Sequence, residues 1–306
     1  MEIHQLRYFV AVAQEKSFSR AAEKVRVAQP SLSQQIQKLE SELGQPLFDR
    51  LARQVVLTEA GEAFLPHAQR ILNEVSSAQR FLSDRSDSPA GEVRLGILPT
   101  IAPFIIQELL AAAAEKLPFV ELNFVEDVTE RLVHKVEEGE IDLAILSTCR
   151  FSASGALEKC AEEPLLAAVP LSHPLAKRGE IIGRDLAKET VLILPESHCL
   201  SRQIHKWCLL HRVRDKRIGA LQLGTLLAVV AADAGISLIP KIAANALRAS
   251  SGCAFIPFKA AKPMREINLL RNTLHYRSKA CIAVSEIAAE TIRKLVGREI
   301  GTGGIL

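Results

Sequence analysis

The stretch SFSRAAEKVRVAQPSLSQQIQKLE, residues 17–40, decides the architecture of the N-terminal part of this chain. Ser19 can cap a short helix through Ala21 and Ala22, because a serine side chain accepts a hydrogen bond from a free backbone N–H there. A second helix opens near Pro30, where a proline is tolerated, and ends at Gly44. Its apolar residues follow helical spacing: Leu32, Ile36, Leu39 and Leu43. The stretch therefore predicts two helices joined by a turn.

The sequence on either side of this stretch completes a small domain. An amphipathic helix precedes it, with apolar residues at helical spacing: Leu6, Phe9, Val10 and Ala13. Residues 46–48 and 55–57 follow as short apolar segments around a polar tip, Asp49 to Gln54, which fits a two-stranded wing. We therefore predict an all-α winged helix-turn-helix domain over residues 1–58.

The polar face of the second helix is a candidate DNA-reading surface. Short hydroxyl and amide side chains near a helix N-terminus suit base edges in a major groove, and arginines on a wing suit phosphates. The candidate residues are Gln29, Pro30, Ser31, Ser33, Gln34, Gln37 and Lys38 on the helix, with Arg50 and Arg53 on the wing. The net charge of this region gives no support for DNA binding, since the first 60 residues hold eight Lys/Arg and seven Asp/Glu. A solvated helix face is the alternative interpretation.

A long helix is expected next, over residues 59–83, with Thr58 as its cap. Its apolar residues alternate by four and three: Phe64, Ala68, Ile71, Val75, Ala78 and Leu82. That spacing indicates a dimerisation seam, with Phe64, Ile71, Val75 and Leu82 as its main members. A helix packed on its own domain is the alternative. Residues 84–91 are polar and rich in turn formers, as in a hinge.

Strand-like and helix-like segments alternate over residues 92–306. Expected strands cover residues 93–98, 120–125, 142–146, 165–169, 191–194, 236–239, 254–258 and 267–270. Expected helices cover residues 101–116, 129–138, 200–210, 226–234 and 278–295. Alternation at this pitch predicts mostly parallel α/β sheets, and the length suggests two lobes with a cleft between them.

Composition excludes several classes of protein. The chain has 306 residues, of which 48% are hydrophobic and 24% charged, so it is neither disordered nor fibrous. Asp233 interrupts the longest apolar run, and no run reaches the roughly 18 residues of a membrane span. The N-terminus has no basic flank or apolar core, so we expect a cytoplasmic protein. Six cysteines are then not expected to form a disulfide framework.

Cys199 and Cys208 stand out among the cysteines. Cys199 is expected at the N-terminal end of a helix, where the helix dipole, His198 and Arg202 favour a thiolate. Cys208 lies nine residues on, about 13 Å along a helix, whereas a disulfide needs Cα atoms within roughly 7 Å. A bond between the two would therefore require the helix to melt. A small buried hydrophobe is the alternative for Cys199 and the expectation for Cys149, Cys160, Cys253 and Cys281.

A zinc site on the same helix is not favoured. His205, Cys208 and His211 recur at every third position, but no fourth ligand is evident in the sequence. We expect no metal and no cofactor.

Residues 1–60 resemble the DNA-binding domain of LysR-type transcriptional regulators. The shared words are Leu6-x-x-Phe9, Ser17-Phe18-Ser19-Arg20-Ala21-Ala22, Gln29-Pro30-Ser31-Leu32-Ser33, Ile36-x-x-Leu39-Glu40, Leu47-Phe48-x-Arg50 and Thr58-x-x-Gly61. Downstream, residues 142–145 and 235–240 resemble the effector domain of that family. The resemblance implies a two-lobed periplasmic-binding-protein-like effector domain, a dimerising linker helix, and a homodimer or homotetramer on double-stranded DNA that contacts RNA polymerase.

The word His198-Cys199-Leu200-x-x-Gln203, followed by Cys208, is similar to the hydrogen-peroxide-sensing members of the family. This resemblance implies that Cys199 is the peroxidatic cysteine and Cys208 the resolving one, in a reversible disulfide switch. It also implies a peroxide pocket lined by Thr100, Thr129, His198 and Arg265. The two threonines could instead be helix N-caps. Residues 222–225 depart from the pattern, since no Ser or Thr opens that helix.

Three other functions are weighed against a peroxide-switched regulator. The first is a LysR regulator that binds a small organic effector in the cleft, with Cys199 incidental. The second is a thiol peroxidase, which would need no DNA-binding domain, so we expect that the chain is not an enzyme. The third is a solute-binding protein, which the absence of an export signal disfavours.

Overall fold

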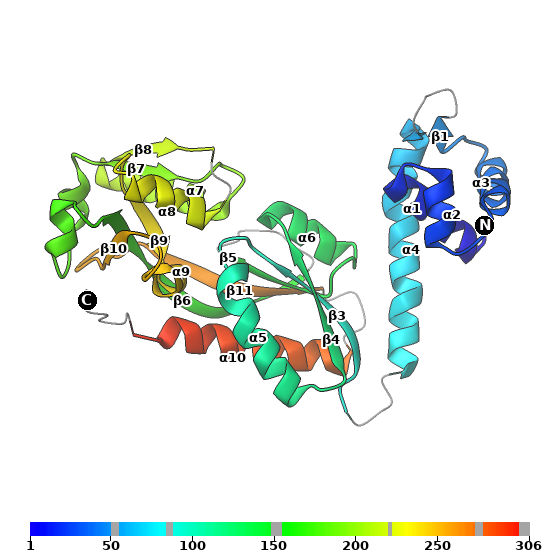
Figure 1. Cartoon of the computed structure of the whole chain (residues 1–306). Helices are drawn as coiled ribbons and strands as arrows, with labels where there is room; N and C mark the ends of the chain where they lie inside the picture. Colours follow the sequence, from blue (N-terminus) through cyan, green and yellow to red (C-terminus); the bar gives the residue numbers. More distant parts are fainter. Residues whose placement is uncertain (50–54, 84–87, 148–154, 220–221, 273–277, 300–306) are drawn as a thin grey trace. The chain divides into compact units, whose positions relative to one another are not determined.

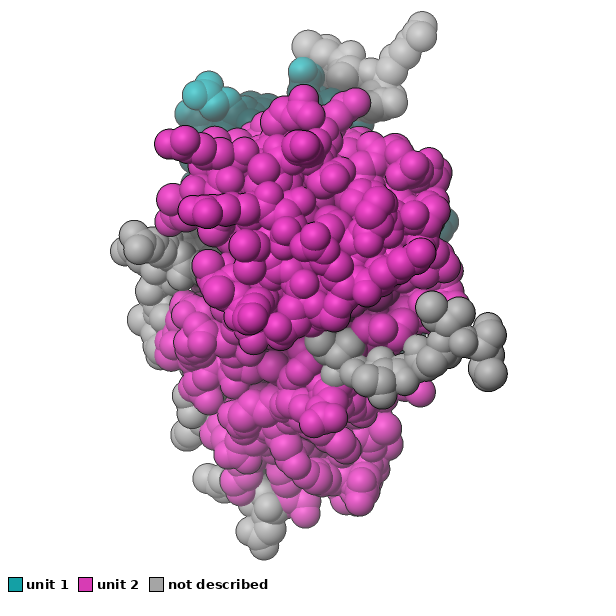
Figure 2. All heavy atoms as spheres, turned by 90° about the vertical axis from the view of Figure 1, so that its left-hand side faces the viewer, with its two compact units in different colours: residues 1–85, 138–140 teal, residues 86–137, 141–306 magenta. Residues whose placement is uncertain are grey.

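The computed structural model describes residues 1–49, 55–83, 88–147, 155–219, 222–272 and 278–299, without the side chains of residues 80–83 and 155. The chain divides into two compact units, Met1–Arg85 with Glu138–Glu140, and Ser86–Glu137 with Ile141–Leu306 (Figure 2). Each unit has its own hydrophobic core. In the described part of the chain, no helix combines the length and apolarity needed to cross a membrane.

The first unit begins with a three-helix core. Helices α1 (Ile3–Glu15), α2 (Phe18–Lys24) and α3 (Gln29–Leu43) bury Leu6, Phe9, Ala21, Ala22, Leu32, Ile36 and Leu39 together. Ser17, and not Ser19, caps α2 by accepting a hydrogen bond from the Arg20 backbone N–H. Leu43, the last apolar residue of that face, is 37% exposed at the end of α3. Gly44 ends the helix in the left-handed conformation, as predicted (φ +69°).

A two-stranded wing joins α3 to helix α4 (Glu59–Ser83). Strands β1 (Phe48–Asp49) and β2 (Val56–Leu57) pair antiparallel, as predicted. Thr58 caps α4, since its Oγ1 accepts a hydrogen bond from the Gly61 N–H at 3.0 Å. Position 61 requires glycine because a Cβ atom there would lie 2.1 Å from the backbone oxygen of Leu47. The Thr58-x-x-Gly61 motif therefore fixes the wing against the start of α4.

The predicted seam along α4 divides into two parts. Phe64 lies 5.4 Å from the Phe9 ring, and Ala68 is fully buried, so both pack into the core of their own unit. Ile71 is 37% exposed and Val75 is half-buried. The side chain of Leu82 lies outside the described residues. Because Phe64 and Ala68 pack within their own unit, only the part of α4 that follows Ala68 is left for contact with a second copy of the chain.

The second unit is built on a sheet with the strand order β10-β6-β11-β5-β3-β4, with β9 also paired to β6 (Figure 1). Its first lobe contains β3 (Gly91–Ile97), α5 (Ala102–Lys116), β4 (Val120–Glu126), α6 (Thr129–Glu137), β5 (Leu143–Ser147) and α10 (Lys279–Gly297). Helices α5 and α10 pack side by side, and α6 lies on the opposite side of the sheet.

The second lobe follows the long strand β6 (Gly155–Pro170). It contains two 3-10 helices (Pro174–Lys177 and Gly183–Leu186), β7 (Thr190–Ile193), α7 (Cys199–His211), β8 (Arg214–Arg217), α8 (Leu223–Ala231), β9 (Ser237–Pro240), α9 (Lys241–Leu247) and β10 (Cys253–Ile256). Strand β11 (Met264–Asn272) returns to the first lobe and pairs with both β5 and β6.

The prediction of mostly parallel sheets was wrong. Strand β3 pairs in parallel with β4 and β5, and β7 with β8, but β5–β11, β6–β11, β6–β9 and β6–β10 are antiparallel pairs. The chain crosses between the lobes on β6 and returns on β11, which places these two strands in opposite directions. The sequence predictions also missed the charged strand β8, the helix α9 and the first half of β6.

Candidate functional site

Helix α7 connects the hydrophobic cores of the two lobes. Its first residue, Cys199, packs into the core of the first lobe, whereas Leu200, Ile204 and Cys208 pack into the core of the second. The Cys199 side chain is 5% exposed and Cys208 is fully buried. Helix α7 therefore places its two cysteines in two separate cores.

Two hydrogen bonds hold the N-terminal half of α7 against the first lobe. Arg202 Nη2 donates to Glu130 Oε1 of α6 at 2.6 Å. Gln203 Nε2 donates to Ser147 Oγ, at the end of β5, at 3.3 Å. His198 occupies the N-cap position without a side-chain hydrogen bond to the helix, so no side chain caps the N-terminus beside Cys199.

Two buried polar atoms next to these contacts have no partner. The Thr129 hydroxyl, beside Glu130, and the Gln203 Oε1 atom each lack a hydrogen bond. Because a buried polar group without a partner costs free energy, such groups are commonly completed by a bound polar molecule. Thr129 is the first residue of α6, and its unpartnered hydroxyl rules out the N-cap role that the sequence left open.

Arg265 lies at the centre of a second polar group. Its guanidinium is buried, forms an ion pair with Glu163, and donates from Nη1 to Thr100 Oγ1 at 3.2 Å. Glu163 Oε2 also accepts from the backbone N–H of Ile242, the second residue of α9, at 3.0 Å. Thr100 is not an N-cap, since Ile101 takes that position before α5. Glu163 therefore balances the positive charge of Arg265, whereas the sequence predictions named Arg265 without a counter-ion.

The sequence predictions did not include Glu163, because nothing in the adjacent sequence distinguishes it from an exposed glutamate. Glu162 and Glu163 are adjacent and both precede Pro164, so nothing in the sequence separates an exposed carboxylate from a buried one. The antiparallel register of β6 and β11 makes the difference, since it sets Glu163 directly opposite Arg265. Pairing between strands about 100 residues apart cannot be deduced from local spacing.

The electrostatics around Cys199 differ from the expectation for His198. Burial lowers the pKa of His198, so its imidazole is neutral near pH 7 and does not supply the expected positive charge. The hydrogen bond to Glu130 raises the pKa of Arg202, and Cys199 contributes a smaller interaction. Arg202 is therefore a cation in electrostatic range of Cys199, and it is paired with Glu130.

Cys208 is held as a neutral thiol. Burial, with a smaller contribution from the Asp215 carboxylate, raises the pKa of Cys208 to about 12. Asp215 lies on β8 and bonds to His205 Nδ1 at 2.9 Å, which joins α7 to that strand. Trp207 packs beside Cys208, against the rings of His211 at 4.3 Å and Phe258 at 5.2 Å.

The zinc site that the sequence disfavoured and the four other cysteines can be compared with the structure. His205 and His211 bond to or stack on different neighbours, and the described residues hold no cluster of three metal-ligating side chains. Cys160, Cys253 and Cys281 are buried, as predicted. Cys149 lies outside the described residues.

The polar face of α3 is open to solvent. Its exposed residues include Gln29, Pro30, Ser31, Gln34, Gln37 and Lys38, while Ser33 is half-buried. Gln35, which the sequence did not single out, bonds instead to His4 and Gln5 on α1 at 3.2 Å each. The two wing arginines, Arg50 and Arg53, lie outside the described residues.

Comparison with known proteins gives matches over nearly the whole chain. Residues 3–62 match the bacterial regulatory helix-turn-helix family of lysR type, and residues 86–293 match the LysR substrate binding domain. The chain is 33% identical to the DNA-binding transcriptional dual regulator OxyR of Escherichia coli (strain K12), over 88% of this chain and 89% of that protein.

Two solved structures also match. A full-length cysteine-to-aspartate mutant of OxyR from Pseudomonas aeruginosa has a TM-score of 0.77 and 28% identity, covering 96% of this chain and 95% of that one. A hydrogen-peroxide-bound cysteine-to-serine mutant of OxyR from Corynebacterium glutamicum has a TM-score of 0.63 and 30% identity, covering 96% and 95%.

Proposed function

This chain belongs to the LysR family of bacterial transcription regulators, and on that premise we propose that it is a DNA-binding regulator switched by hydrogen peroxide. The observation that carries the proposal is the placement of Cys199 and Cys208 on one helix but in two hydrophobic cores. The similar proteins support it, since they include hydrogen peroxide-inducible genes activators and a peroxide-bound OxyR structure.

The first chemical step uses the Cys199 end of α7. The Cys199 thiolate attacks one oxygen of hydrogen peroxide, the O–O bond breaks, and the departing hydroxide takes a proton to leave as water. The products are a sulfenic acid on Cys199 and one water molecule. The unpartnered Thr129 hydroxyl and Gln203 Oε1 support binding here, because peroxide both donates and accepts hydrogen bonds. His198, neutral and buried, completes the proposed pocket.

Arg265 and Thr100 take part in this pocket through their shared hydrogen bond. With its charge balanced by Glu163, Arg265 acts mainly as a hydrogen-bond donor that fixes the Thr100 hydroxyl. The proposed role of Thr100 is to orient the peroxide oxygen that leaves. This step moves one proton and leaves the buried ion pair unchanged.

The second step joins the two cysteines. The Cys208 sulfur attacks the Cys199 sulfur, the S–OH bond breaks, and a second water leaves, so two thiols and one peroxide give one disulfide and two waters. Nine residues of helix correspond to a rise of about 13 Å between the Cα atoms of Cys199 and Cys208, whereas a disulfide needs Cα atoms within roughly 7 Å. Helix α7 must therefore unwind and Cys208 must leave the core of the second lobe, which couples the chemistry to a change of conformation.

Trp207, the only tryptophan of the chain, reports that change directly. Its indole packs against His211 and Phe258, so leaving this site should shift its fluorescence when about one equivalent of peroxide is added. Dithiothreitol should reverse the shift, which separates it from oxidation of tryptophan itself. A Cys208→Ser variant should form sulfenic acid without the structural phase, and Cys199→Ser should lose both. Retention of the full reversible signal in Cys199→Ser would refute the proposal and leave an organic effector as the better explanation.

On DNA, we propose that α3 reads the major groove of paired half-sites in promoters. Ser33 and Gln34 lie on its solvent side, so Ser33→Ala or Gln34→Ala should weaken binding to the specific site by about 1–3 kcal/mol and spare non-specific binding. The wing arginines would add phosphate contacts. Titration of a promoter fragment measures the loss, and unchanged binding in both variants would refute this role of α3.

The proposed assembly is a homodimer or homotetramer, with Ile71 and Val75 of α4 in the dimer seam. A charge in that seam, as in Val75→Glu, should dissociate the dimer and shorten the footprint, because two half-sites are no longer held together. Sedimentation of an unchanged oligomer would refute this role. We further propose that the DNA-bound protein acts in the cytoplasm and contacts RNA polymerase to activate transcription.

A further inference from the structure

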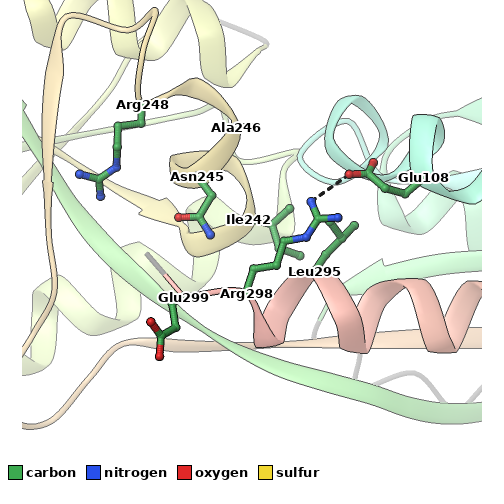
Figure 3. A pocket seen from close by; sticks show the side chains of 8 residues that line it. All are labelled: Glu108, Ile242, Asn245, Ala246, Arg248, Leu295, Arg298 and Glu299. Atoms are coloured by element: carbon green, nitrogen blue, oxygen red, sulfur yellow. Dashed lines mark hydrogen bonds and ion pairs between the residues drawn. The ribbon is translucent and has the colours of Figure 1, made fainter. Parts of the chain in front are cut away.

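A pocket of about 370 Å³ lies between helices α5, α9 and α10, outside the thiol site described above (Figure 3). Its apolar lining includes Ile242 of α9 and Leu295 of α10, both buried. Helix α9 borders both lobes, since Ile242 packs into the core of the first lobe and Ala243 into the core of the second. A molecule in this pocket would therefore contact elements of both lobes.

Two residues that line the pocket each carry a buried polar atom without a hydrogen-bond partner. Asn245 Oδ1 is an acceptor, and Arg248 Nε is a donor in a guanidinium that lies 5.9 Å from the centre of the Phe255 ring. Buried polar atoms are satisfied in the great majority of cases, so each of these two points to a group that is bound there. The missing group has to supply a donor to the asparagine and an acceptor to the arginine.

The charges at the pocket are balanced. Arg298 reaches from α10 to Glu108 of α5, where Nη1 donates to Oε1 at 3.0 Å (Figure 3). Arg248 and Glu299 complete a set of two cations and two carboxylates. A purely anionic ligand would be repelled by both carboxylates and would offer no donor to Asn245 Oδ1. A purely cationic ligand would be repelled by both arginines and would offer no acceptor to Arg248 Nε.

We propose that this pocket binds a free apolar α-amino acid of about the size of leucine. Its carboxylate accepts from Arg248 Nε, its ammonium donates to Asn245 Oδ1 and the neighbouring carboxylates, and its side chain covers Ile242 and Leu295. A zwitterion is the chemical class that satisfies both unpartnered atoms and adds no net charge. The site requires none of the thiol chemistry, and it would add a second input to the lobes.

Isothermal titration of the reduced, full-length protein with L-leucine tests the proposal. We expect saturable binding with one site per chain. Leucine methyl ester, which lacks the carboxylate, and 4-methylpentanoate, which lacks the ammonium, should each bind at least about tenfold more weakly. Cys199→Ser protein should bind leucine as the unaltered chain does, which separates this site from the peroxide proposal.

Variants locate the site. Asn245→Leu and Arg248→Ala should each weaken leucine binding by about tenfold or more, since a tenfold change is what the loss of one good polar contact produces. Arg131→Ala, on the exposed face of α6, is the matched control and should bind normally. The proposal is overturned if leucine, isoleucine, valine and methionine all give no saturable heat of binding at concentrations up to about 10 mM, which would detect even a millimolar dissociation constant. It is equally overturned if both pocket variants bind as the control does.

Discussion

The two ends of helix α7 have opposite environments, although they belong to one continuous helix. The Cys199 end packs on the first lobe, carries the Arg202–Glu130 ion pair, and lies beside polar atoms without partners. The Cys208 end is fully buried in the second lobe, and its thiol pKa is raised to about 12. In the proposed mechanism, the Cys199 end meets a small polar oxidant, and Cys208 stays out of reach until the helix opens.

This difference assigns separate physical tasks to the two cysteines. Reactivity at Cys199 depends on nearby polar groups, whereas the delay before Cys208 reacts depends on the stability of packing in the second lobe. Substitutions at one end should then leave the other end largely unchanged, because residues without shared partners contribute independently. Each of the following predictions tests that separation.

The largest effect is expected at the buried ion pair of Glu163 and Arg265, which belongs to the proposed peroxide pocket. Glu163→Gln leaves the buried Arg265 charge without its opposite charge, so the free energy of unfolding should fall by about 3–5 kcal/mol. Glu158→Gln is the matched control, since Glu158 pairs with Arg271 on the same two strands at the surface and should cost at most about 1 kcal/mol. Urea unfolding of both variants measures the difference. Equal losses would show that the buried pair has no special role.

The second prediction concerns pH and the Cys208 end. The folded pKa of this thiol, about 12, lies above its ordinary value of 9.0, so the folded state disfavours the thiolate. Stability is therefore unaffected below about pH 9 and should fall between pH 9 and 12, by up to about 1.4 kcal/mol per pH unit from this group. Denaturation of the reduced protein should show a slope that Cys208→Ala reduces. Identical slopes in the two proteins would contradict the raised pKa.

Asp215 should control how quickly Cys208 reacts once Cys199 is oxidised. Asp215→Asn removes one cause of the raised Cys208 pKa and the bond to His205, so disulfide formation should accelerate. The gain should stay within about tenfold, since burial is the larger cause. Stopped-flow Trp207 fluorescence measures this phase, and sulfenic acid trapping measures the first step. A change in the first step would mean that the two ends are coupled.

His205→Gln should give the smallest effect. The pair of His205 with Asp215 is partly exposed, and such pairs contribute about 0.2–1 kcal/mol. The variant should therefore unfold almost as the unaltered chain does, with a modest acceleration of the Trp207 phase. A loss of stability as large as that of Glu163→Gln would remove the distinction between the two ends of α7.

The sequence by itself determined the features that depend on short spacing. The apolar positions of α1 and α3, the glycine at 44, the Thr58 cap and the start of α7 beside Cys199 are set by residues a few positions apart. Helix periodicity and capping act over one or two turns, so they are legible in a linear chain. The nine-residue separation of the two cysteines belongs to the same class.

Only the tertiary structure decided which groups are paired and which are left alone. The register of β6 and β11 joined Glu163 to Arg265, burial made His198 neutral, and the packing of α4 turned Phe64 into its own unit. The charged segment Arg214–Arg217 became a strand beside β7, although its composition favours a loop. Pairing and burial depend on contacts between residues far apart in the chain, and the free energy of a charge depends on its surroundings more than on its neighbours in sequence.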